Sequence, residues 1–210
     1  SAWLRTKLSR VQILQRPSHT HTQMGEWSTS VRMRLARWPL RIETDTGGAA
    51  WYSADDRYRY ALLRRWSAAA PDVWIMANPS TATASTDDPT IARVCAFSRR
   101  WGAGGVVVVN LFAYRSTDPA VLDLVDEPVG PHCDAVIDAV VGVGARTVLA
   151  WGTPGRRGGR PAAVLDRLEE PLWCLTHLQD GTPGHPLYKP ATLRPVRYAS
   201  TDAGSSTRQG

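Results

Sequence analysis

The sequence has 210 residues, 43% of them hydrophobic, which is enough for one α/β domain with a substantial core. No apolar run approaches the ~20 residues of a membrane span, and the first residues lack a signal-peptide core, so we expect a cytoplasmic protein with no membrane partner. Cys95, Cys133 and Cys174 are far apart and form no CxxC pair, which argues against a disulfide framework, a zinc site or an iron–sulfur cluster. We therefore expect buried thiols, with no metal and no cofactor.

The formal net charge of +6 would favour nucleic acid as a partner, but the charge is unevenly distributed. Residues 1–43 contain eight of the 25 basic and two of the 19 acidic residues, which leaves 17 of each in the rest of the chain. We expect residues 1–23 to form a poorly ordered basic arm, which is either a solvated tail or a phosphate-binding arm.

The segment up to residue 52 alternates apolar and polar side chains at 31–35 and again at 40–42, and Gly47-Gly48 would form a turn. This pattern predicts strands that form either a hairpin or an addition to the edge of a sheet. We assign residues 1–47 to the arm and this hairpin, residues 48–198 to an α/β domain, and residues 199–210 to a polar, disordered tail.

A helix is expected from residue 55 to 66. Tyr58, Leu62 and Trp66 recur every four residues, which places them on one face of a helix. This apolar stripe is interpreted as part of the core, with a platform for stacking a ligand as the alternative.

Four apolar runs predict strands that are buried on both faces, as parallel strands are. Segments with helical patterns separate them, and Asp88 with Pro89 marks a helix start as N-cap and first helical residue. The alternation predicts a three-layer αβα fold with a central four-stranded parallel sheet and right-handed crossovers. The strands are expected at 73–77, 106–109, 146–152 and 171–176, and the helices at 88–101, from 119, at 131–141 and at 162–168.

Each predicted strand ends in a polar loop. Because the carboxyl ends of parallel strands lie at one edge of a sheet, we expect these loops to converge on a ligand site. The residues expected there are Asn78, Ser80, Thr81, Asn110, Phe112, Tyr114, Arg115, Gly152, His177, His185 and Tyr188.

Asn78, Asp87 and Asp88 carry the chemistry expected of the first loop. The Asn78 amide could orient a water or read a base edge, or it could only close a turn before Pro79. One of the two carboxylates would cap the helix, and the other would be a general base or a substrate contact; both could instead be plain helix-start residues.

His185 lies in Gly184-His185-Pro186, a rigid loop after the last strand, and suits the stabilisation of an anion or donation to a carbonyl oxygen. A histidine with a purely structural role is the alternative, and His177 is the second candidate. Phe112 would either stack on a planar ligand or fill the core. No Walker or dinucleotide-binding loop, metal-ligand spacing or nucleophile elbow is found in the sequence.

The motifs RYRYALLRRW, ANPSTATASTDDPTIARV, VVVVNLFAYRSTDP, VLAWG and GHPLYKP resemble those of an uncharacterised family of bacterial and phage proteins, known only as a domain of unknown function. The resemblance covers about residues 48–198. It implies no activity by itself.

The order of motifs is also similar, more distantly, to that of the uracil-DNA glycosylase superfamily. In the mismatch-specific branch of that superfamily, the motif after the first strand contains an Asn-Pro pair whose Asn positions the attacking water. The last motif of the superfamily is a His-Pro or Asn-Pro loop after the fourth strand, which contacts the base carbonyl. Asn78-Pro79 and Gly184-His185-Pro186 match these motifs, and Asn110 matches the asparagine that ends the second strand. The segment from Ser80 to Asp88 and the pair Leu187-Tyr188 depart from the pattern.

This resemblance implies a DNA glycosylase-like hydrolase that acts in DNA repair or modification on a modified or mismatched base. Asn78, Asp87, Asp88 and His185 would be catalytic, and the other converging residues would bind substrate. The expected partner is nucleic acid, DNA rather than RNA, or a nucleotide-like small molecule. The alternatives are a non-catalytic nucleic-acid- or nucleotide-binding module and another nucleotide-modifying enzyme that uses the same cleft.

Overall fold

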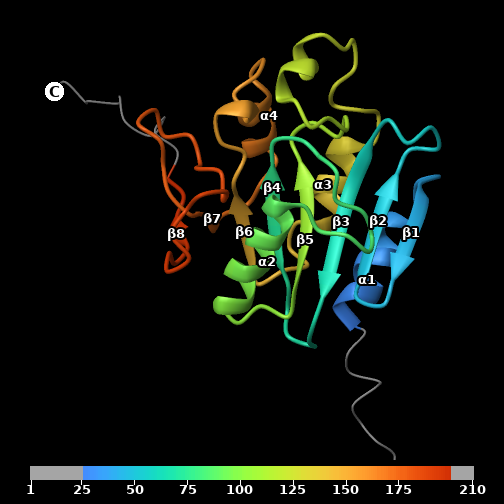
Figure 1. Ribbon diagram of the computed structural model, residues 1–210, viewed down its shortest axis with the longest axis horizontal. Coiled ribbons are helices and arrows are strands. Elements are labelled where there is room, and N and C mark those ends of the chain that lie inside the picture. Colours follow the sequence, from blue (N-terminus) through green and yellow to red (C-terminus); the bar gives the residue numbers. More distant parts are fainter. Residues whose placement is uncertain (1–25, 200–210) are drawn as a thin grey trace, which may run out of the picture.

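The computed structural model describes residues 26–199 and shows a mixed α/β fold built on one sheet (Figure 1). The predicted basic arm at residues 1–23 lies outside the described residues, as does the predicted tail apart from Ala199. Within residues 26–199, none of the helices combines the length and the apolar character needed to cross a lipid bilayer.

The sheet has eight strands in the order β1-β2-β3-β5-β4-β6-β7-β8. In the middle of the sheet, β4 pairs in parallel with β5 and β6, and β6 pairs in parallel with β7. On one side, β1 pairs with β2, β2 with β3 and β3 with β5, all antiparallel. On the other side, β8 pairs antiparallel with β7. A four-stranded parallel sheet alone therefore does not describe the protein. The strands are β1 (Arg41–Asp45), β2 (Gly48–Tyr52), β3 (Arg59–Arg65), β4 (Asp72–Met76), β5 (Gly105–Asn110), β6 (Arg146–Leu149), β7 (Leu172–Cys174) and β8 (Val196–Arg197).

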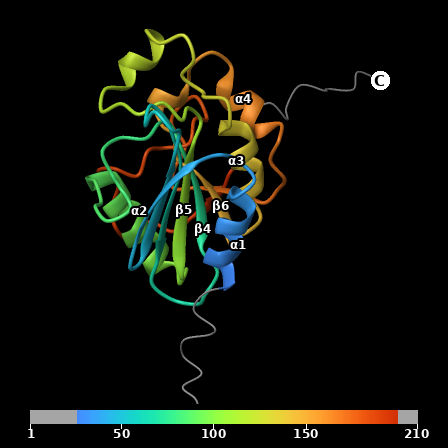
Figure 2. The same ribbon diagram turned by 90° about the vertical axis from the view of Figure 1, so that its right-hand side faces the viewer.

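Helices lie on both faces of the sheet, with α2 on one side and α1 and α3 on the other (Figure 2). Short 3-10 helices, η2 and η3, follow β5 and β6. The helices are α1 (Glu26–Leu35), α2 (Pro89–Arg100), α3 (Cys133–Val140) and α4 (Arg160–Leu165), and the 3-10 helices are η2 (Pro119–Asp123) and η3 (Thr153–Gly155).

The core has two parts because alternate residues of a buried strand point to opposite faces. Val73 and Ile75 of β4 pack on the side of α1 and α3, whereas Trp74 packs on the side of α2. The Trp74 indole also donates to the Ser98 hydroxyl of α2 at 2.9 Å and stacks on Trp101 at 5.5 Å between ring centroids. Helix α2 is thereby fixed over β4, and its first residues are held near the end of that strand.

Several sequence-based expectations are confirmed. The four apolar runs form β4, β5, β6 and β7, and strands β1 and β2 form the expected hairpin, although Gly48 already belongs to β2. Asp88 caps α2, with its side chain accepting a hydrogen bond from the backbone N–H of Ile91 at 2.8 Å. The three cysteines are free and buried.

The strand predicted at residues 31–35 is wrong, since these residues belong to α1. The buried residues Trp27, Ser28, Val31 and Leu35 follow helical spacing, and Met33, which the alternating pattern placed with Val31 and Leu35, is 70% exposed. Alternation over five residues was too short to distinguish the two periods.

The helix predicted at residues 55–66 is also wrong, since Arg59–Arg65 is strand β3. Residues four apart share a face in a strand as well as in a helix, so the spacing of Tyr58, Leu62 and Trp66 does not discriminate between them. The pairing of β3 with both β2 and β5 decides the outcome, because Ala61, Leu62 and their neighbours are then buried on both faces.

Candidate functional site

A cavity of about 550 Å³ opens at the carboxyl edge of β4, β5 and β6, on the face of the sheet that α2 covers. Its floor is formed by side chains of the strand ends and of α2, including Met76, Val108 and Ile91. Polar groups from the four loops that follow β4, β5, β6 and β7, and from the start of β3, surround this floor. Of the predicted site residues, the structure brings seven together here: Asn78, Ser80, Asp88, Asn110, Gly152, His185 and Tyr188.

Asn78 follows β4, and two hydrogen bonds from its side-chain amide to the backbone fix its orientation. The Nδ2 group donates to the carbonyl oxygen of Ser116 at 2.9 Å and to that of Pro79 at 3.2 Å. Because the donor end of the amide is bound to the backbone, Oδ1, an acceptor, is the end of the side chain that remains for a ligand or water.

Asn110 ends β5 and is 3% exposed. Its Nδ2 group is buried and has no hydrogen-bond partner among the described residues. A buried donor that is left unpaired costs free energy, so this amide is a candidate contact for an acceptor on a ligand.

Asp88 has two roles at the start of α2. One carboxylate oxygen accepts the Ile91 N–H as the N-cap, and the side chain also lines the cavity. The hydrogen bond from the Ile91 N–H therefore fixes the orientation of the Asp88 carboxylate, which lies at the cavity.

His185 is held as a neutral donor. The backbone N–H of Leu187 donates to Nδ1 at 3.2 Å, so in the neutral ring the proton is on Nε2. Burial lowers the pKa of His185 from its ordinary value of 6.5; the Asp88 carboxylate opposes this shift, and Lys189 adds to it. At neutral pH the ring therefore lines the cavity with an N–H donor and no charge.

Gly152, after β6, approaches His185 closely. A Cβ at this position would lie 2.9 Å from the His185 Cβ, and its φ of +60° favours glycine. The glycine thus allows the loop after β6 to pack directly against the histidine.

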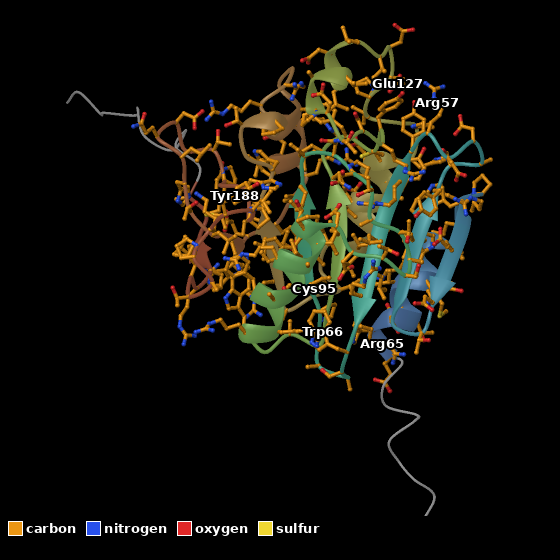
Figure 3. All side chains as sticks on the ribbon, viewed as in Figure 1. Arg57, Arg65, Trp66, Cys95, Glu127 and Tyr188 are labelled. Carbon is orange, nitrogen blue, oxygen red and sulfur yellow. The ribbon has the colours of Figure 1, made fainter. Side chains whose placement is uncertain are left out.

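Tyr188 is 94% exposed at the edge of the cavity and has a φ of +63°, which is unusual for a residue with a side chain (Figure 3). It projects from the segment that follows β7. Its ring is free to stack on a planar ligand at the cavity entrance.

The other predicted site residues lie outside the cavity. Phe112 is 4% exposed and belongs to the core, as its packing interpretation expects. Tyr114 packs edge-on against Tyr58, and the His177 ring stacks on that of Tyr198. The remaining three are Arg115, whose Nη1 donates to the Asp56 carbonyl at 3.0 Å, Thr81, which is exposed, and Asp87.

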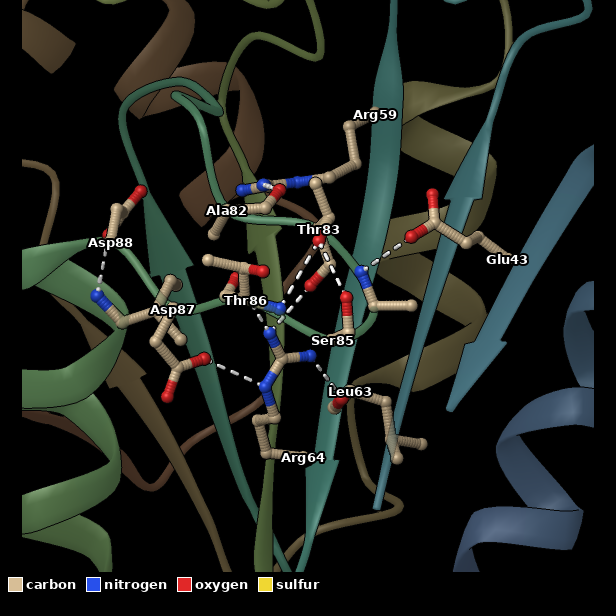
Figure 4. Close-up of polar contacts among 12 residues, drawn as sticks. Glu43, Arg59, Leu63, Arg64, Ala82, Thr83, Ser85, Thr86, Asp87 and Asp88 are labelled. Carbon is tan, nitrogen blue, oxygen red and sulfur yellow. Dashed lines mark hydrogen bonds and ion pairs between the residues drawn. The ribbon is translucent and has the colours of Figure 1, made fainter. Parts of the chain in front are cut away.

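Asp87 pairs with Arg64 of β3 in a contact of 2.8 Å (Figure 4). The same guanidinium donates to the carbonyl oxygens of Thr83 at 2.6 Å and Thr86 at 3.1 Å. The loop between β4 and α2 is thus fastened to β3 through its backbone, and Asp87 belongs to this anchor and not to the cavity.

Arg59, the first residue of β3, was missed by sequence reasoning and lines the cavity. It is 2% exposed, and Nη1 donates to the carbonyl oxygen of Ala82 in the same loop. Burial lowers the pKa of Arg59 to about 10, and the nearby Asp88 opposes the shift. The guanidinium therefore remains charged at neutral pH. Four further polar residues that the sequence analysis did not identify line the cavity: Thr90, Ser116, Thr117 and Lys189.

Among the described residues, no group of three or more His, Cys, Asp or Glu side chains is arranged to hold a metal ion.

An α/β protein with a polar cavity at the carboxyl edge of parallel strands belongs to a large class of ligand-binding folds. Within that class, the chain belongs to the family described as "Protein of unknown function (DUF1643)", whose profile matches residues 59–187. The expectation of an uncharacterised family is confirmed. No curated protein and no solved structure matches the chain.

Proposed function

We propose that the protein hydrolyses the N-glycosidic bond between a nucleobase and its sugar. The observation that carries this proposal is the convergence of three groups on one cavity: an oriented amide oxygen at Asn78, a carboxylate at Asp88 and a neutral N–H donor at His185. The distant resemblance to the mismatch-specific branch of the uracil-DNA glycosylase superfamily, in which an Asn-Pro pair and a His-Pro or Asn-Pro loop have such roles, supports the same reaction class.

The attacking water would be held between Asn78 and Asp88. The Asn78 Oδ1 atom would accept a hydrogen bond from the water, and the Asp88 carboxylate would take up its proton as the water oxygen bonds to C1′. Positioning matters here because an oriented water reacts with little loss of entropy in the transition state.

The leaving base would be stabilised by His185. As the bond from C1′ to the base nitrogen breaks, the electron pair remains on the base, and the negative charge spreads to its carbonyl oxygens. A neutral Nε2–H donor stabilises such an oxyanion without the proton transfer that an imidazolium would invite. The base would then acquire a proton, either from the carboxylic acid of Asp88 or from solvent. The unpaired Nδ2 of Asn110 would donate to a base acceptor, and Tyr188 would stack on the ligand at the entrance.

Base release provides the test. Purified protein is incubated with single- and double-stranded DNA carrying a panel of modified pyrimidines, and with the corresponding nucleosides and nucleotides, and free base is measured by chromatography. The His185→Ala variant should lower the rate of release by about 10² to 10³, the loss typical for removal of one oxyanion donor.

His177→Ala is the matched control, because His177 lies on the same segment after β7 but stacks on Tyr198 outside the cavity. It should retain the wild-type rate. No release of base from any substrate would refute the proposal, and binding without turnover would identify a nucleotide- or nucleic-acid-binding module.

A further inference from the structure

Arg59 is a buried cation without a carboxylate partner. In the part of the chain that the structure describes, Arg64, Arg146 and Arg160 are less deeply buried, and each forms an ion pair, with Asp87, Asp72 and Asp134 respectively. Arg59 forms none among those residues. Its Nε atom is buried and has no hydrogen-bond partner there.

The position of Arg59 suits an anion. A guanidinium binds carboxylates and phosphates side-on through two adjacent N–H groups, and Nε belongs to that edge. A buried charge is unfavourable unless it is paired, so a ligand anion that reaches Arg59 would supply the missing partner. The buried Nδ2 of Asn110 is also unpaired and lines the same cavity, and its proposed acceptor is on the base, which leaves Arg59 for an anionic group of the ligand.

The formal charges of the residues that line the cavity also favour an anionic ligand. The formally charged side chains of the cavity are those of Arg59, Lys189 and Asp88, and the pKa of His185 is lowered by burial, so the lining has a formal net charge of +1. A ligand with at least one negative charge would be attracted.

We propose that Arg59 forms a phosphate subsite and that the substrate is a free nucleoside 5′-monophosphate. This inference rests on the proposed function, since it specifies the substrate of the same cavity. Arg59 lines the cavity but is only 2% exposed, which favours a terminal phosphate at the end of a ligand over a phosphodiester, whose chain continues on both sides of the phosphate. Outside residues 1–43, basic and acidic residues are equal in number, which gives no excess of charge for a nucleic-acid backbone. The cavity of about 550 Å³ lies within the range of sites for small molecules.

The test compares equilibrium binding of the common nucleosides, their 5′-monophosphates and short single-stranded oligonucleotides, by calorimetry with the full chain. For the preferred base, the monophosphate should bind at least about tenfold more tightly than the nucleoside, as expected for a charge-assisted hydrogen bond in a buried site. The oligonucleotide should bind more weakly than the monophosphate.

Variants assign this preference to Arg59. Arg59→Gln should abolish it, and Arg59→Lys should retain part of it. Arg64→Gln is the matched control, because Arg64 lies on the same strand and anchors the same loop but does not line the cavity. It should keep the ratio of the two affinities even if both fall. Lys189→Gln, at a partly exposed position, tests the second cation if the Arg59 variants do not fold, and it should reduce the ratio.

Equal affinity for nucleoside and monophosphate, a stronger affinity for the oligonucleotide, or an unchanged ratio in folded Arg59→Gln would each overturn the inference. Chromatography of the same mixtures separates this result from the proposed reaction. Preferential binding of monophosphates without release of base would leave the phosphate subsite in place and refute the hydrolysis. Release of base from DNA alone, without a preference for monophosphates, would support the hydrolysis and refute the phosphate subsite.

Discussion

The adjacent carboxylates Asp87 and Asp88 provide the sharpest prediction, because neighbouring positions have different environments. Asp88 caps α2 and lines the cavity, whereas Asp87 pairs with Arg64 outside it. Three variants separate capping from chemistry: Asp88→Asn, Asp88→Ala and Asp87→Asn.

The stability effects follow from the cap. Loss of the hydrogen bond from Ile91 N to the Asp88 carboxylate in Asp88→Ala should cost about 1 kcal/mol, the usual value for an N-cap. Asparagine is an equally good cap, so Asp88→Asn should keep the hydrogen bond and lose the interactions of the charge with the helix dipole, about 0.5 kcal/mol, and with the buried Arg59. For a chain of this length, 1 kcal/mol corresponds to a change in Tm of roughly 2–4 °C.

The loss of activity in these variants should not parallel the loss of stability caused by changes at the N-cap. If the Asp88 carboxylate accepts the proton of the attacking water, both Asp88 variants should lose at least about 100-fold in kcat, the lower range for a general base. Asp87→Asn should lose little activity, because it removes a partly exposed ion pair worth about 1 kcal/mol or less.

Differential scanning calorimetry and the chromatographic assay of base release would be run on all three variants. Turnover by Asp88→Asn at the wild-type rate would refute the role of Asp88 as a base. A loss in Asp87→Asn as large as that in Asp88→Asn would show that the two carboxylates are not separated as the structure places them.

Three other predictions concern single side chains. Because the pKa of His185 is below its ordinary value of 6.5, the unfolded chain binds more protons than the folded chain as the pH falls. The free energy of unfolding should therefore have its full value above about pH 6.5 and decrease below it. Thermal unfolding from pH 5 to 8 should show a smaller decrease for His185→Gln than for the wild type, and identical profiles would contradict this. Phe112→Leu should lower the free energy of unfolding by about 1 kcal/mol and leave KM unchanged, since the ring fills the core; an increase in KM would restore the stacking interpretation. Tyr188→Gly should change stability by less than about 1 kcal/mol, because glycine adopts positive φ readily, while weakening ligand binding; unchanged affinity would exclude a stacking role.

The sequence was informative where local chemistry is sufficient. Apolar runs that end in polar loops predicted β4 to β7, and the rule that parallel strands share a carboxyl edge placed Asn78, Asn110 and His185 at one cavity. Asp88-Pro89 predicted the start of α2 because capping is a short-range interaction.

Sequence reasoning failed where partners distant in the chain decide the structure. The sequence pattern predicts a helix where β3 forms, and it therefore gives Arg59 no place at the site. Because β3 runs antiparallel to β5, it brings its first residue to the edge where the parallel strands bring their last. Similarly, whether Phe112 turns toward the core or the cavity depends on the packing of Leu122 and other distant side chains. Which of Asp87 and Asp88 enters the cavity depends on Arg64, 23 residues from Asp87.

The two outer strands of the sheet also have a consequence for association between copies. An open sheet edge exposes unpaired N–H and C=O groups, which can recruit a strand from another molecule and start aggregation. Strand β1 has charged side chains at Arg41, Glu43 and Asp45, and β8 has only two residues and follows Pro195. Within the described chain, both edges are therefore poor templates for strand addition, which should allow the protein to be concentrated for binding measurements without growth of the sheet from one copy into the next.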